Sequence, residues 1–153
     1  MNVISLIANV VMLVVLETAV AAPGAASAPK AEILGVWKGT SICTKVEGNE
    51  FCRDETVVYN VVDVPNQPAT VTLKAARIVE DSVQPMYSLY FTYRPDNGNW
   101  TSEFERPSFS GVWAYVVHGD EMTGTATVLP GMKIVRNVAA KRVSKDDVRE
   151  SRP

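Results

Sequence analysis

The sequence predicts an all-β protein in which eight antiparallel strands close into an up-and-down barrel. Runs rich in β-branched and aromatic residues alternate with turn-forming segments. The connections are too short for a helical crossover, so consecutive strands must pair antiparallel. Closure removes the exposed edges of the sheet, whereas a two-sheet sandwich, the alternative, usually needs longer connections. The expected strands are Ile33–Cys43, Arg53–Val64, Thr70–Glu80, Met86–Arg94, Asn99–Arg106, Phe109–His118, Glu121–Leu129 and Met132–Val143.

The N-terminal segment, residues 1–21, is expected to be a secretory signal peptide that precedes the fold. Val3–Leu16 carries no charge and is shorter than the about 20 residues that a membrane span needs. It leads into small residues that suit cleavage after Ala21. Because no Lys or Arg precedes the apolar run, an uncleaved signal anchor is the alternative. A cleaved chain would be secreted or periplasmic, without an integral membrane span.

The predicted barrel domain, residues 33–143, lies between two segments of low apolar content. Residues 22–32 are rich in Ala, Pro and Gly, which is typical of a disordered linker, and residues 144–153 form a charged tail that we expect to be flexible. The domain is long enough to bury a core without help from a metal ion.

Turn residues separate the strands in order along the chain. Asn97-Gly98 is the strongest hairpin signal, because both residues tolerate a positive φ. Between the breaks, Trp100, Ser102 and Phe104 alternate with polar residues, as expected of a strand with one face in the core. The breaks are residues 47–49, 65–68, 80–82, 95–98, 107–108, 119–120 and 130–131.

Cys43 and Cys52 are the only cysteines in the chain, and we expect them to form one disulfide. An even cysteine count behind an export signal favours this interpretation. Cys43 ends the first strand and Cys52 precedes the second, so antiparallel pairing should bring their Cα atoms within about 7 Å. Its expected role is structural.

Composition and motifs argue against several functional classes. The chain has 15 basic and 17 acidic residues and no basic run, so nothing attracts nucleic acid or an anionic membrane. Two cysteines and one histidine do not complete a zinc site, and neither a metal nor another cofactor is expected. Nucleophile-elbow, zinc-protease and phosphate-loop motifs are absent from the sequence, which leaves catalysis unsupported.

Gly35-Val36-Trp37 stands at the start of the first expected strand. A Gly-x-Trp followed by eight meandering strands resembles the lipocalin-like, or calycin, barrels, although their Thr-Asp-Tyr motif is missing here. The resemblance implies that Trp37 plugs one end of the barrel and that Arg142, on the last strand, packs over it.

Alternation predicts a barrel interior rich in aromatic rings. A small apolar ligand inside the barrel would contact these rings, so we select six inward-facing aromatic residues as candidate binding residues. The alternative is a packed core, because an eight-stranded barrel is barely wide enough to hold more than its own side chains. The candidates are Tyr59, Tyr87, Phe91, Trp100, Trp113 and Tyr115.

Arg77 is the candidate polar anchor for an acidic group on that ligand. Val71, Leu73 and Ala75 face inward, and strict alternation turns Arg77 inward as well. A buried guanidinium needs an anionic partner. A bulge near Ala75-Ala76 that turns Arg77 outward, or a position at the barrel mouth, is the alternative.

The function that the sequence favours is binding of a small, largely apolar ligand by an exported barrel. The second hypothesis is a non-catalytic protein-interaction module with a filled barrel, whose protein partner the sequence does not identify. The third is a barrel enzyme or haem protein that uses His118, which stands at a predicted turn. An internal cavity would favour the first hypothesis over the second.

Overall fold

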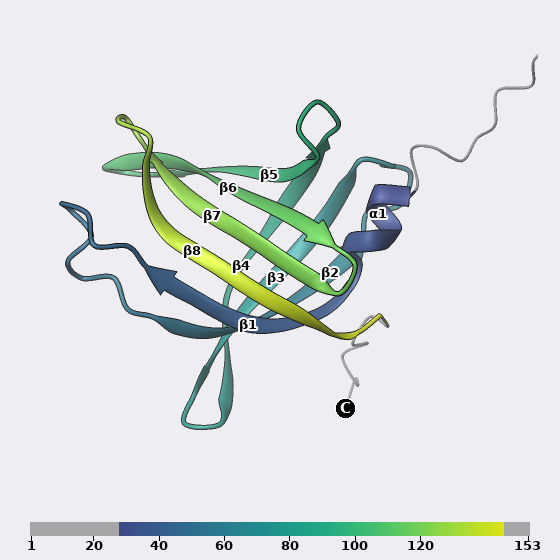
Figure 1. Ribbon diagram of the computed structural model, residues 1–153, viewed down its shortest axis with the longest axis horizontal. Helices are drawn as coiled ribbons and strands as arrows, with labels where there is room; N and C mark the ends of the chain where they lie inside the picture. The colour runs from purple at the N-terminus through teal and green to yellow at the C-terminus, as the bar shows by residue number, and fades with distance from the viewer. Residues whose placement is uncertain (1–27, 146–153) are drawn as a thin grey trace, which may run out of the picture.

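The computed structural model describes residues 28–145, and within them it shows a closed antiparallel barrel (Figure 1). Each strand pairs with the next, and β1 pairs with β8, so the predicted eight-stranded up-and-down barrel is confirmed. The elements are α1 (Ala28–Ile33), β1 (Gly35–Cys43), β2 (Glu55–Asp63), β3 (Thr70–Val79), β4 (Ser82–Arg94), β5 (Asn99–Arg106), β6 (Phe109–His118), β7 (Glu121–Leu129) and β8 (Lys133–Ser144).

The strand bounds agree closely with the sequence pattern, except in β4. This strand begins at Ser82 instead of Met86, and it includes Pro85. The register between β3 and β4 shifts at Ala75/Ala76, where Met86 is left without a partner. Such a bulge lets a strand continue past a proline, which cannot donate a backbone hydrogen bond. The longer β4 makes the β3–β4 hairpin project from the barrel (Figure 1).

The helix α1 occupies part of the segment that the sequence predicts to be a disordered linker. The Lys30 Nζ donates to the carbonyl oxygens of Val64 and Gln67, at 2.9 and 2.8 Å, and it forms an ion pair with Asp63. Ile33 is fully buried in the core. These contacts hold a segment whose composition alone would not fold. The predicted signal, residues 1–21, and residues 146–153 of the predicted tail lie outside the described residues.

Trp37 closes the end of the barrel beneath α1. Its side chain is completely buried, and its Nε1 donates to the Ile33 carbonyl at 2.9 Å. The guanidinium carbon of Arg142 lies 4.1 Å from the centre of the Trp37 ring, which is the arrangement that the resemblance implies. Arg142 also donates to the carbonyls of Glu32 in α1, of Leu34 and of Gly119, and to Asp120, so one side chain joins β8 to α1 and the β6–β7 turn.

The core fills the half of the barrel next to this plug. Two glycines on inward faces make room for aromatic rings on the neighbouring strand. A Cβ on Gly124 would lie 2.3 Å from the Tyr115 ring, and one on Gly111 would lie 2.4 Å from the Phe104 ring. The rings therefore fill the space that these glycines leave. The largest fully buried side chains include Trp37, Tyr59, Leu73, Phe91, Trp100, Tyr115 and Met122.

The barrel wall is weakest between β4 and β5. These strands pair only from Thr92↔Thr101 to Arg94↔Asn99. By contrast, β5 pairs with β6 from Trp100 to Arg106, which is nearly its whole length. Beyond the short pairing, β4 and β5 diverge toward the end of the barrel opposite to α1. This divergence widens the interior at that end.

None of the helices within residues 28–145 is long and apolar enough to span a membrane.

Candidate functional site

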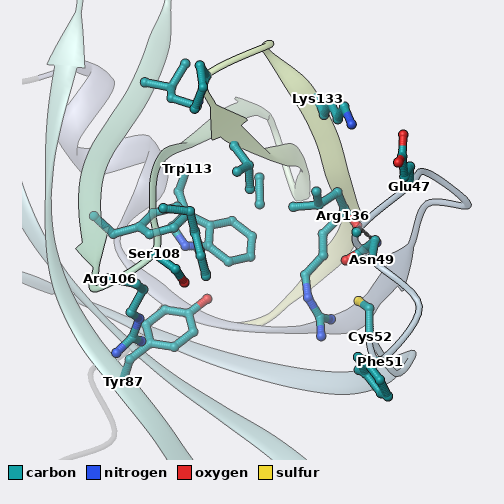
Figure 2. Close-up of a pocket in the computed structure, with 18 of the residues that line it drawn as sticks. Glu47, Asn49, Phe51, Cys52, Tyr87, Arg106, Ser108, Trp113, Lys133 and Arg136 are labelled. Carbon is teal, nitrogen blue, oxygen red and sulfur yellow. Dashed lines mark hydrogen bonds between the residues drawn. The ribbon is translucent and has the colours of Figure 1, made fainter.

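A cavity of about 660 Å³ opens at the end of the barrel opposite to the Trp37 plug. The β1–β2 loop, the β5–β6 hairpin and the β7–β8 turn form its rim. In Figure 2, Tyr87 and Trp113 lie on one side of this space and Arg136 on the other. The volume falls in the range of about 300–1,000 Å³ that is typical of small-molecule sites. The inner wall consists of Tyr87, Leu89, Phe104, Trp113, Ala126, Val128, Val135 and Arg136.

Stacked aromatic rings form one side of the cavity and continue into the core. The Trp113 ring lies 5.9 Å from the Tyr87 ring and 6.0 Å from the Tyr115 ring, and both pairs are stacked. Phe104 adds a tilted contact to Trp113 at 6.4 Å between ring centres. These residues occupy inward positions on β4, β5 and β6, so the alternation of each strand brings the rings together.

The six aromatic residues selected from the sequence divide into two groups. Tyr87 and Trp113 line the cavity. The others lie below it in the packed core, with exposed fractions of 2% or less, and they are Tyr59, Phe91, Trp100 and Tyr115. The barrel is therefore filled at its closed end and hollow at its open end. Of the two alternatives for the interior, the packed core describes the closed half and the ligand cavity describes the open half.

Arg77 does not line the cavity. It pairs with Val57 across β2 and β3, which keeps it on the inward register, but its side chain is 46% exposed. It contacts Gln84 at 3.2 Å and Glu55 at 3.5 Å. The bulge near Ala75-Ala76 is present, with its extra residue on β4 and not on β3. Arg77 lies at the barrel mouth because the β3–β4 hairpin extends beyond the cavity.

Arg136 is the cation of the inner cavity wall, with Arg106 and Lys133 at the rim, and the sequence reasoning missed it. Its Nη1 lies 3.0 Å from a Glu55 oxygen and 3.0 Å from the Ser41 hydroxyl. Its Nη2 donates to the Arg53 carbonyl at 3.1 Å. The signal was available, because Arg136 shares its alternation with the buried residues Val138 and Ala140.

Glu55 holds Arg136 in this position from β2, which is separated from β8 by β1. It is the first residue of β2 on the inward face that also carries Val57 and Tyr59. The side chains of Glu55 and Arg136 are only 16% and 19% exposed, so water screens this pair weakly. Its second oxygen faces Arg77, which makes Glu55 the shared counter-ion of an inner and an outer arginine.

The Cys43–Cys52 disulfide and nearby hydrogen bonds fix one side of the cavity rim. The two Cα atoms lie 5.9 Å apart, which confirms the predicted bridge. Asn49, in the loop that the bridge closes, donates to the Thr44 and Val135 carbonyls at 2.8 and 2.9 Å. The loop is thereby attached to β8. Phe51 is 93% exposed and lies beside Cys52 at the rim.

Three tyrosine hydroxyls form a polar group at the inner end of the cavity. Burial raises the pKa of Tyr59, Tyr87 and Tyr115 above the ordinary tyrosine value, and each hydroxyl interacts with the other two. The Tyr115 hydroxyl is buried and has no well-formed hydrogen bond among residues 28–145. At neutral pH all three are therefore uncharged hydrogen-bond donors.

These raised pKa values predict a loss of stability in alkali. Above pH of about 10, unfolded tyrosines lose their protons while the buried ones keep them. The native state then binds more protons than the unfolded state, so the free energy of unfolding falls as pH rises. Urea titrations across this pH range, followed by tyrosinate absorbance, measure the effect. Tyr87→Phe should flatten the decline, whereas Tyr90→Phe, at a 68% exposed position, should not. Native tyrosines that all ionise near pH 10 would contradict this prediction.

His118 lies away from the cavity. It is the exposed last residue of β6 and pairs with Glu121 at the β6–β7 turn, which is at the closed end. It does not contribute to the cavity wall, so a haem or general-base role for His118 has no support from the geometry.

Comparison with known proteins identifies the architecture. Neither a protein-family model nor a curated protein matches the chain. Among solved structures, it is similar to the crystal structure of Echinococcus granulosus fatty-acid-binding protein 1, with a TM-score of 0.51 and 14% identity over 74% of this chain and 98% of that one. The fold is that of a lipocalin-like, calycin-type barrel. The siderocalin Ex-FABP is also similar, with a TM-score of 0.39 and 8% identity over 76% of this calycin-type chain and 73% of that one.

Proposed function

We propose that this calycin-type barrel is an exported protein that binds a small, largely apolar ligand in its open-ended cavity. The observation that carries the proposal is the aromatic wall around Trp113 in a cavity of about 660 Å³. A filled barrel, which the interaction-module hypothesis requires, would leave no such space. The similar Echinococcus protein is named for binding fatty acids, but at 14% identity that likeness supports the fold alone.

Export is part of this proposal. A disulfide persists in oxidising compartments, and the apolar N-terminal segment is of the length and composition of a signal peptide. An acidic ligand group at Arg77, which the sequence suggested, has no support because Arg77 lies outside the cavity wall and contacts Glu55.

Ligand binding is tested by titrating the purified protein with decanoic acid and with methyl decanoate. Either probe should change the fluorescence of Trp113 and give a saturable heat signal in calorimetry. Val128→Phe, which adds bulk to the cavity wall, should weaken binding by about tenfold or more. Thr127→Phe is the matched control, because the neighbouring side chain points to the opposite face of β7.

The control variant should bind like the parent protein. If neither probe changes the fluorescence or releases heat, small-molecule binding of this class is wrong and the interaction-module hypothesis replaces it. If Val128→Phe and Thr127→Phe weaken binding equally, the ligand does not occupy this cavity.

A further inference from the structure

Some polar groups at the inner end of the cavity already have hydrogen-bond partners, whereas the Tyr115 hydroxyl has no well-formed one within residues 28–145. Tyr115 follows Trp113 on the inward face of β6, and its hydroxyl is buried without a well-formed hydrogen bond among the described residues. The Tyr87 hydroxyl belongs to the cavity wall, next to this buried group. Burying a hydrogen-bond donor without a partner destabilises the protein. A ligand oxygen that accepts from this donor removes that penalty, so the bond contributes more to binding than an ordinary hydrogen bond would.

The charged group of the inner wall, Arg136, is already paired, whereas Arg106 and Lys133 lie at the rim, at the end of β5 and the start of β8. Arg136 has the Glu55 carboxylate at 3.0 Å, and it also donates to Ser41 and to the Arg53 carbonyl. Glu55 therefore occupies the position that a ligand carboxylate would need. A second carboxylate beside Glu55 would be repelled, because like charges in a poorly hydrated site interact strongly.

We propose that the inner end of the cavity recognises an uncharged oxygen acceptor, such as the carbonyl of an ester, ketone or aldehyde, and that Glu55 selects against carboxylates. This inference rests on the proposed function and names the ligand class for the same cavity. The Tyr87 hydroxyl donates to the ligand oxygen at the wall. The Tyr115 hydroxyl lies behind it and donates either to the ligand or to the Tyr87 oxygen, which leaves the Tyr87 proton free for the ligand.

The experiment compares methyl decanoate with decanoic acid, which have the same acyl chain and differ in the charge of the polar end. The parent protein should bind the ester at least about tenfold more tightly than the acid at neutral pH. Glu55→Gln should shift the ratio of ester affinity to acid affinity by about tenfold in favour of the acid, because Arg136 then becomes available to a carboxylate.

Tyrosine variants test the donors separately. Tyr87→Phe and Tyr115→Phe should each weaken binding of the ester, whereas Tyr90→Phe, on the exposed face of β4, should not. Tyr115→Phe should unfold at an equal or higher urea concentration in the absence of ligand, since it removes an unpaired buried hydroxyl. A variant that weakens the ester without losing stability separates recognition from a structural defect.

The outcomes distinguish this inference from the proposed function. Tighter binding of decanoic acid than of methyl decanoate by the parent protein would overturn the inference and leave ligand binding intact. An unchanged ratio of ester affinity to acid affinity in Glu55→Gln would show that Glu55 does not select against carboxylates. Absence of binding by both probes would overturn the proposed function and this inference together.

Discussion

Replacing Trp37 with alanine is expected to lower the free energy of unfolding by about 3–5 kcal/mol, as other large-to-small core substitutions do. The side chain is completely buried, and its removal leaves a cavity beneath α1. It also removes the donor to the Ile33 carbonyl and the ring on which Arg142 lies. The cation–ring contact alone contributes about 0.5–2 kcal/mol. Equilibrium urea unfolding, compared at equal m-value, measures the change.

Trp37→Phe is the graded control for this experiment. It keeps an aromatic ring under Arg142 but loses the indole donor, so its cost should lie between those of the parent and the alanine variant. An alanine variant as stable as the parent would show that the plug does not hold the closed end of the barrel together.

The second large effect is expected at the Glu55–Arg136 pair. Glu55→Leu should cost roughly 3 kcal/mol, because it leaves a mostly buried guanidinium without its anion. Arg136→Met should cost less, since Glu55 keeps Arg77 at 3.5 Å. Replacing both residues together should restore most of the lost stability, because no buried charge is then unpaired. Urea unfolding of the parent, both single variants and the double variant gives the coupling free energy.

The exposed pair Glu121–Lys141 supplies the matched control. Its atoms are 4.0 Å apart and its side chains are 72% and 81% exposed, so Glu121→Leu should change stability by less than about 1 kcal/mol. Strong coupling would be contradicted if the double variant lost as much unfolding free energy as Glu55→Leu and Arg136→Met lose in sum.

The period-two alternation of polar and apolar residues made most of the fold predictable. It located the eight strands and the inward faces that carry Tyr87, Trp113 and Tyr115. It did not reveal how far along the barrel each side chain lies. Arg77 and Arg136 both have inward parity, yet Arg77 is at the mouth and Arg136 is in the cavity wall. Strand tilt and the overhang of the β3–β4 hairpin determine that depth, and neither is visible in alternation.

Two other features were beyond the reach of local patterns. The residues of α1 have the composition of a linker, and it is Lys30 that fixes the helix through contacts with the β2–β3 connection, more than thirty positions away. The hollow half of the barrel depends on where β4 and β5 separate. A sequence shows which residues could pair, whereas the point at which two strands stop pairing depends on the packing of the whole barrel.

The pairing of β1 with β8 has a consequence for how the chain folds. Arg142 and its acceptor Leu34 are 108 residues apart in the sequence. Contacts of such long range form slowly, because a large loop must close before they contribute. During ribosomal synthesis, β1 to β7 emerge before β8, and until then they can form only an open sheet with two unpaired edges. Such edges pair readily with other chains, so the nascent protein should need a chaperone or rapid completion to avoid aggregation.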